Sequence, residues 1–181
     1  GSQSTTCERQ PRGPLVSGGV RMVEVNGNAW AYREKGTGPT ALLITPAMGD
    51  SSFYLSQLNG LKDVRRMIAP DLLGFGHSEP STVEFIDPYV YARDFICLLD
   101  ALGVDEKVDL VGMSVGAFIA GLIYEMAPER VRSITLISGT FEFERNLPYE
   151  RYQHENARNV VVEGRDMLFR RFDEYIRDRN A

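Results

Sequence analysis

The stretch Val108–Pro128 constrains the fold more than any other part of this chain of 181 residues. It begins with the apolar run Val108–Val111, passes through Gly112–Gly116, and stays apolar in a helix-like pattern as far as Met126. A short apolar run before glycine is typical of a buried strand, and a longer run that stops at proline is typical of a helix. The sequence therefore predicts a strand that turns tightly into a helix at Ser114.

The residues around Ser114 favour a turn that presents a reactive hydroxyl. Glycines two positions before and after the serine let a strand and a helix pass closely without Cβ clashes. The hydroxyl would stand at the start of the helix, where the backbone N–H of Val115 has no helical partner and can bind a developing oxyanion. We predict Ser114 as a nucleophile and Val115 as an oxyanion donor. The alternative is a glycine-rich turn with a solvent-facing serine.

Composition and charge exclude several classes of protein. The net charge of −5 argues against a nucleic-acid binder, and no apolar run approaches the length that spans a membrane. The two cysteines make no disulfide framework. Cys7 lies in a polar tail, and Cys97 falls in a helical apolar pattern that indicates a buried, unreactive thiol. A reducing, cytoplasmic setting is therefore expected.

Strand-like and helix-like segments alternate through the middle of the chain. Such alternation predicts an α/β fold with a doubly wound, mostly parallel sheet. Residues 1–18 are expected to be a flexible lead-in, residues 19–140 an α/β core, and residues 141–181 the start of a helical lid. The predicted strands are 21–25, 29–33, 41–45, 66–69, 108–111 and 131–137, with helices at about 53–61, 87–102 and 115–126.

Three motifs occur in the order that the α/β-hydrolase superfamily uses. They are ALLITPAMGDSS, DLLGFGHSEPS and VGMSVGAFIA, and the chain resembles that superfamily over roughly residues 20–140. Thr45-Pro46 stand where most members have His-Gly, and in this respect the chain is similar to small esterases and to the relatives of 3-oxoadipate enol-lactonase. The resemblance implies that Ala47 supplies the second oxyanion N–H. For Met48 and Phe75 it leaves pocket lining and plain packing open.

A serine nucleophile needs a histidine base and an acid, and the resemblance implies the chain order serine, acid, histidine. His77 precedes Ser114, so we expect it at a loop or pocket edge. His154 follows Ser114, but it lies in a charged helical segment and is expected to be solvated. The acid position falls near Ser138, with Glu142 and Glu144 just beyond.

The last two strands of the fold, with the histidine and the acid, are therefore expected in a further C-terminal polypeptide. A fragment, or a short homologue without these groups, is the alternative. A free edge at 131–137 disfavours a free-standing fold of this length, because an apolar edge strand invites aggregation.

Taken together, these features predict a serine hydrolase that cleaves a small carboxylic ester or lactone through an acyl-enzyme on Ser114. No metal or organic cofactor is expected, because no cluster with ligand spacing occurs. The resemblance leaves carbon–carbon bond hydrolases open, since they share the serine. It argues against haloalkane dehalogenases and soluble epoxide hydrolases, which use aspartate there. A non-catalytic protein that binds a ligand or a partner is the rival interpretation.

Overall fold

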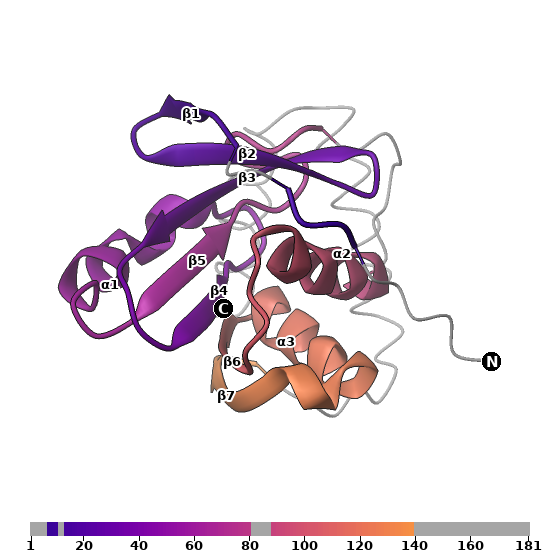
Figure 1. Ribbon diagram of the computed structural model, residues 1–181. Helices are drawn as coiled ribbons and strands as arrows, with labels where there is room; N and C mark the ends of the chain where they lie inside the picture. Colours follow the sequence, from indigo (N-terminus) through magenta and orange to yellow (C-terminus); the bar gives the residue numbers. More distant parts are fainter. Residues whose placement is uncertain (1–6, 11–12, 81–87, 140–181) are drawn as a thin grey trace, which may run out of the picture. The chain divides into compact units, whose positions relative to one another are not determined.

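Seven strands form one sheet in the computed structural model, which describes residues 7–10, 13–80 and 88–139. They are β1 (Leu15–Ser17), β2 (Val20–Val25), β3 (Asn28–Lys35), β4 (Thr40–Ile44), β5 (Arg66–Pro70), β6 (Val108–Met113) and β7 (Val131–Ile137). Their spatial order is β1-β2-β3-β5-β4-β6-β7 (Figure 1). Strands β5, β4, β6 and β7 are parallel neighbours, whereas β1, β2 and β3 are antiparallel and join through β3 to β5.

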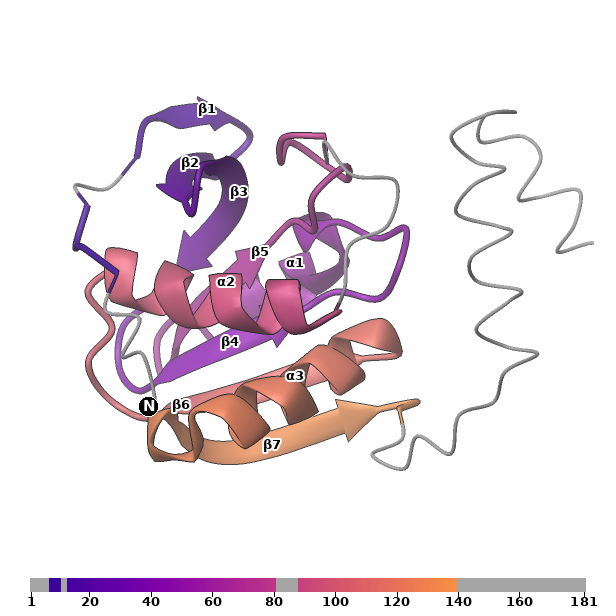
Figure 2. The same ribbon diagram turned by 90° about the vertical axis from the view of Figure 1, so that its right-hand side faces the viewer.

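Helices cover both faces of this sheet, as parallel strands require. They are η1 (Ser51–Tyr54), α1 (Leu55–Gly60), α2 (Pro88–Ala101), α3 (Val115–Met126) and η2 (Pro128–Arg130). Figures 1 and 2 show α2 and α3 side by side on one face, while α1 lies on the other. Every residue of β4 is buried, which is typical of a central strand covered from both sides.

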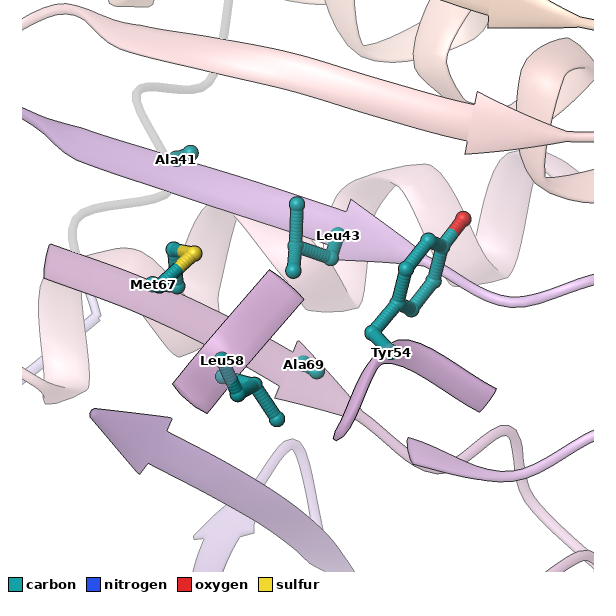
Figure 3. Close-up of a cluster of buried hydrophobic side chains, with 6 residues drawn as sticks. All are labelled: Ala41, Leu43, Tyr54, Leu58, Met67 and Ala69. Carbon is teal, nitrogen blue, oxygen red and sulfur yellow. The ribbon is translucent and has the colours of Figure 1, made fainter. Parts of the chain in front are cut away.

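One layer of the core lies between β4, β5 and the helix pair η1–α1. Successive residues of a strand point to opposite faces, so alternate positions of each strand meet these helices. The side chains in this layer are Ala41, Leu43, Tyr54, Leu58, Met67 and Ala69 (Figure 3). On the opposite face, Trp30 of β3 meets the rings of Tyr91 and Phe95 of α2 edge-on, with centroids 5.9 and 5.2 Å apart.

The predicted doubly wound, mostly parallel sheet is confirmed, and the predicted strands lie within two residues of the observed ones. The helix predicted from residue 53 begins earlier, as the 3-10 turn η1, because the Asp50 carboxylate accepts the Ser52 N–H at 2.8 Å and caps it. A short strand, β1, forms at Leu15–Ser17, where no strand was expected. The predicted lid at 141–181 lies outside the described residues.

The two cysteines are bonded to each other, so Cys97 is buried as predicted but is not the free thiol that was expected. The disulfide joins Cys7 to α2 across 90 positions of sequence. Gln10 continues the attachment, because its N–H donates to the Ala101 carbonyl at 3.0 Å. The bond removes the basis for expecting a reducing compartment. No helix of the described ranges is long and apolar enough to cross a membrane.

Candidate active site

Ser114 joins β6 to α3 with a backbone conformation that side-chain-bearing residues rarely adopt. Its φ is 53° and its ψ is −118°, and its side chain is exposed. The Ser114 N–H donates to the Ile137 carbonyl of β7 at 3.0 Å, and its carbonyl accepts the Ala117 N–H at 3.0 Å. Neighbouring elements thus hold the strained turn from both sides. The hydroxyl makes no capping hydrogen bond to α3, so it is not committed to the helix end.

The two glycines that flank Ser114 are needed for the close approach of three elements. A methyl group at Gly112 would overlap the Gly116 carbonyl and lie 2.7 Å from the Ala117 nitrogen. A methyl group at Gly116 would overlap the Ile44 carbonyl and lie 2.7 Å from the carbonyl oxygen of Thr45. The close packing predicted from the glycines is therefore present. It places the start of α3, with the Val115 N–H, directly against the end of β4.

A tight turn follows β4 at this point of contact. The Gly49 N–H donates to the Pro46 carbonyl at 3.2 Å, and the turn between them consists of Ala47 and Met48. Met48 has a φ of 64°, and its side chain is 58% exposed. Ala47 is also exposed. The exposed Met48 side chain is available to line a pocket, as is that of half-buried Phe75 in the loop after β5, and both roles stay predictions.

Strained backbone collects at one edge of the sheet. Four described residues other than glycine have a positive φ, and one of them, Asn26, belongs to the hairpin between β2 and β3. The other three are Met48, Ser114 and Ser138, which follow β4, β6 and β7. These strands are neighbours and parallel, so the three residues share the carboxyl edge of the sheet. Strain of this kind persists where the surroundings enforce it, and it clusters at functional sites.

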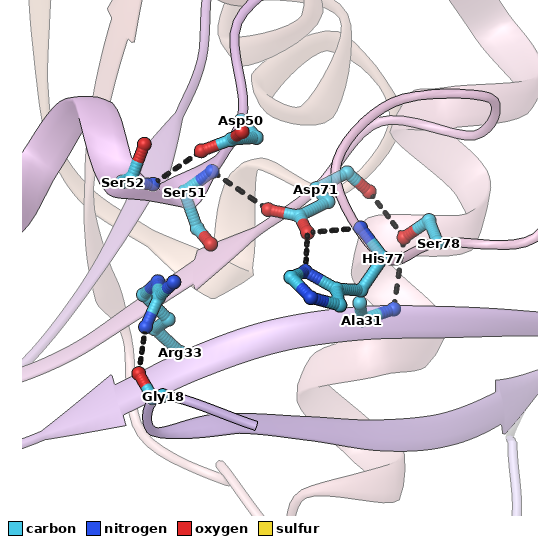
Figure 4. Close-up of polar contacts among 9 residues, drawn as sticks. All are labelled: Gly18, Ala31, Arg33, Asp50, Ser51, Ser52, Asp71, His77 and Ser78. Atoms are coloured by element: carbon cyan, nitrogen blue, oxygen red, sulfur yellow. Dashed lines mark hydrogen bonds and ion pairs between the residues drawn. The ribbon is translucent and has the colours of Figure 1, made fainter. Parts of the chain in front are cut away.

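Asp71 occupies the carboxyl end of β5 and contacts two loops at once. Its carboxylate is buried and accepts the Ser51 N–H at 2.6 Å and the His77 N–H at 2.9 Å (Figure 4). The His77 ring lies 3.9 Å from the same carboxylate, as measured from Nδ1. Sequence reasoning missed Asp71. The available signal was an acidic residue at a strand end before a loop punctuated by glycines.

Asp50 adds a second carboxylate at this edge. The hydrogen bond from Ser52 lowers the pKa of Asp50, partial burial opposes that shift, and the charges of Arg33 and His77 lower the pKa further. Asp50 is therefore ionised at neutral pH. The described residues contain no group of three or more His, Cys, Asp or Glu side chains placed to hold a metal ion.

The structure brings together some of the predicted site residues, places one apart from them, and does not describe the others. Ser114, Val115 and Ala47 lie at the adjoining ends of β6, α3 and β4. His77 follows β5, which β4 separates from β6, and its ring faces Asp71. His154, Glu142 and Glu144 fall outside the described residues.

Comparison with known proteins points to one family. The model of the family described as alpha/beta hydrolase fold matches residues 40–166. A 2-hydroxymuconate semialdehyde hydrolase of Pseudomonas putida is 38% identical over 112 residues, which are 58% of this chain and 37% of that protein. The enzyme of the same name from Pseudomonas sp. (strain CF600) is 44% identical over 73 residues, which are 40% of this chain and 25% of that protein.

Among solved structures, a thermophilic esterase from Thermogutta terrifontis superposes with a TM-score of 0.75 at 24% identity, covering 82% of this chain and 56% of the esterase. At that identity the likeness concerns the fold. The chain thus spans a quarter to somewhat over half of the length of these proteins.

Proposed function

The chain belongs to the α/β-hydrolase fold family, and from this premise we propose that it hydrolyses a carboxylic ester or lactone through an acyl-enzyme on Ser114. The observation that carries the proposal is the strained, exposed Ser114 at the start of α3. A strand-to-helix turn of this kind is where hydrolases of this fold place a nucleophile. The named relatives are themselves hydrolases.

The proposed reaction uses the contact between α3 and the end of β4. The Ser114 hydroxyl attacks the carbonyl carbon while its proton passes to a histidine. The N–H groups of Val115 and Ala47 bind the resulting oxyanion, and the histidine then protonates the leaving alkoxide. Water, deprotonated by the same histidine, releases the acid and restores the serine. Only a backbone donor is required at position 47, so alanine suffices there.

The histidine and its acid are proposed to come from polypeptide beyond the described residues. His77 is a poor candidate because its ring faces Asp71, at the end of a strand that is not adjacent to β6. The described part of the sheet ends at β7, where the side chain of Ile137 is 40% exposed. An apolar edge of this kind favours a further strand beside β7. The greater length of the relatives is consistent with such a segment.

A carbon–carbon bond hydrolase is the second candidate, and the relatives support it specifically. Two of them carry the name 2-hydroxymuconate semialdehyde hydrolase. A compound of that name contains a carboxylate, an enol and an aldehyde but no ester, so its hydrolysis breaks a carbon–carbon bond. The same serine and the same two N–H groups serve either reaction. The finer likeness to enol-lactonases rests on Thr45-Pro46 and favours the ester or lactone.

Replacing Ser114 by Ala tests the proposal. In the full polypeptide, Ser114→Ala is expected to lower the turnover of a p-nitrophenyl ester by at least about 10⁴-fold, because removing a nucleophile removes the acyl-enzyme route. The matched control is Ser133→Ala, which removes a hydroxyl bonded to Asp109 at 2.6 Å near the amino end of β7 and leaves turnover unchanged. Turnover that survives Ser114→Ala would refute the assignment.

Substrate choice separates the two candidates and the rival. Faster turnover of 2-hydroxymuconate semialdehyde than of the ester supports the carbon–carbon bond hydrolase. A protein that binds small carboxylic esters but turns over neither substrate supports the non-catalytic interpretation.

A further inference from the structure

The buried carboxylate of Asp71 binds two separate loops at the carboxyl edge of the sheet. The side chain of Asp71 is buried, and each of its oxygens accepts a backbone N–H from a different loop: Oδ1 from Ser51, at 2.6 Å, and Oδ2 from His77, at 2.9 Å. An ionised carboxylate only accepts hydrogen bonds, and bonds of this type are stronger than those between neutral groups. Asp71 is thus built to hold both loops at once (Figure 4).

The backbone of Asp71 is itself held by hydrogen bonds. Its N–H donates to the Ala31 carbonyl of β3 at 2.8 Å, and its carbonyl accepts the Ser78 hydroxyl at 2.8 Å. The Ser78 oxygen in turn accepts the Ala31 N–H at 2.8 Å. The loop must also pass very close to the carboxylate, because a methyl group at Gly76, where φ is 54°, would overlap Asp71 and lie 2.9 Å from the Asp50 Cβ. The position of Asp71 is therefore fixed, and the neighbouring backbone leaves little room around its carboxylate.

The loop that begins at Ser51 leads directly back to the turn with the proposed oxyanion donor. Ser51 opens η1, two residues after the turn formed by Pro46–Gly49. At the other end of η1, the Tyr54 hydroxyl donates to the Ile44 carbonyl at 2.8 Å. Burial raises the pKa of Tyr54 to about 12, so this hydroxyl stays a donor at neutral pH. The turn is thus held between β4 on one side and the Asp71–Ser51 bond on the other.

We infer that Asp71 is a positioning residue, which holds the Ala47 turn and the Phe75 loop as one rigid unit and so aims the Ala47 N–H at the oxyanion. The inference rests on the proposed function, since it assigns a supporting residue to that site. As a positioning residue, Asp71 is assigned no contact with the substrate. It acts through Ser51 on the turn and through His77 on the loop.

The substitution Asp71→Asn tests this inference with little change of shape. The amide retains one acceptor oxygen, but its NH₂ group faces the other backbone N–H, so one loop loses its partner. In the full polypeptide we expect kcat for a p-nitrophenyl ester to fall by about 10- to 100-fold, because a misplaced oxyanion donor weakens transition-state binding. KM should change by less than about 3-fold, because the substrate ground state does not use that donor.

Amide hydrogen exchange provides a readout that needs no activity. We expect Asp71→Asn to speed exchange in the peptides that contain residues 46–52 and 72–78, while exchange in α2 and α3 stays unchanged. The matched control is Asp94→Asn, which changes another fully buried carboxylate that accepts the Asn26 side-chain N–H at 2.7 Å. The control should alter neither those two peptides nor kcat.

The outcomes separate the inference from the proposed function. Faster exchange in both loops with the fall in kcat supports the inference. Unchanged exchange in either loop, or faster exchange with an unchanged kcat, overturns it. Equal turnover by the wild type and by Ser114→Ala overturns the proposed function, and the exchange data then still decide whether Asp71 couples the loops.

The wild type offers a second test should the variant fail to fold. If Asp71 couples the loops, the Ser51 and His77 amides open together, and their protection factors agree within about 10-fold. A larger difference overturns the inference.

Discussion

The two edges of the parallel sheet handle unusual backbone in opposite ways. At the amino edge, the segments that lead into β4 and β6 take a positive φ at Gly36, Gly38 and Gly103, where glycine adopts it without strain. At the carboxyl edge, a positive φ also occurs at Met48, Ser114 and Ser138, and these residues carry side chains.

The two edges also differ in how their charged side chains are bound. The amino edge carries ion pairs between side chains, such as the partly exposed Arg132–Asp109 and the half-buried Arg130–Asp100. The carboxyl edge instead buries the carboxylate of Asp71 against backbone N–H groups. Within the parallel sheet, strained backbone at residues other than glycine and a carboxylate bound by backbone N–H groups thus both occur at the edge that carries the proposed site. We therefore expect changes at the carboxyl edge to affect catalysis, and changes at the amino edge to affect stability alone.

A methyl group added at the contact between α3 and β4 should have the largest effect. Gly116→Ala places a methyl group against the Ile44 and Thr45 carbonyls, so we expect a loss of about 3–5 kcal/mol in the free energy of unfolding, together with loss of hydrolysis. Urea denaturation and ester turnover measure the two effects. The matched control is Gly60→Ala, which meets nothing within 4 Å in α1 and should stabilise the protein slightly. Equal effects of the two substitutions on stability and on turnover would contradict the expectation that the carboxyl edge is the edge on which catalysis depends.

Removing the disulfide should have the second-largest effect, and it should lower stability without changing catalysis. Cys7 is bonded to Cys97 near the end of α2 that leads to β6, away from the strained turns. Cys7→Ser frees a loop of 90 residues, which is expected to lower the free energy of unfolding by about 2–4 kcal/mol. Thermal denaturation and steady-state kinetics at a temperature where both proteins are folded provide the test. A changed kcat would contradict the separation of the two edges.

Relieving the strain at Ser114 should raise stability while it abolishes activity. Ser114→Gly removes the Cβ from a residue whose φ is 53° and whose ψ is −118°. Strain of this kind amounts to about 1–3 kcal/mol, so the variant should unfold at a higher denaturant concentration than Ser114→Ala. The comparison with Ser114→Ala isolates the backbone, because both variants lack the hydroxyl. Equal midpoints for the two variants would show that the turn stores no strain.

The smallest effect is expected from the surface ion pair at Asp109. The hydrogen bond from Arg132 lowers the pKa of Asp109, partial burial opposes that shift, and Ser133 and Arg65 lower the pKa further. The stability that Asp109 contributes is therefore present above its ordinary pKa of 3.8 and is lost as the pH falls through its lowered pKa.

Asp109→Asn tests this contribution. Because the Arg132 side chain is 40% exposed, the variant should move the thermal midpoint at pH 7 by only about 2 °C or less. The difference from the wild type should vanish toward pH 2. A difference that persists at pH 2, or a change in kcat, would contradict this assignment.

The sequence predicted the parallel strands because local patterns define them. Ala41–Ile44 is apolar without interruption, and the observed strand there is buried throughout. The spacing of glycines around Ser114 predicted the close approach of β6 and α3 for a similar reason, since the requirement for a missing Cβ is visible in the residue type, whereas the contact of Gly116 with the end of β4 was not predicted.

Features that depend on the path of the chain could not be predicted in this way. Asp71 bonds to residues 20 positions before it and 6 after it, so its partners appear only once the loops are folded together. The disulfide is an extreme case, because its cysteines are 90 positions apart and one of them lies in a polar tail.

Labelling with a fluorophosphonate, followed by intact-mass and peptide mass spectrometry, tests the assignment of Ser114 most directly. The probe reacts with a serine whose hydroxyl is activated and whose oxyanion is bound, and this combination is what we propose for Ser114. We expect one added phosphonyl group, located on the peptide that contains Ser114, in the full polypeptide and none in Ser114→Ala. A full polypeptide that stays unlabelled, or that is labelled equally in Ser114→Ala, would contradict a nucleophilic role for this serine.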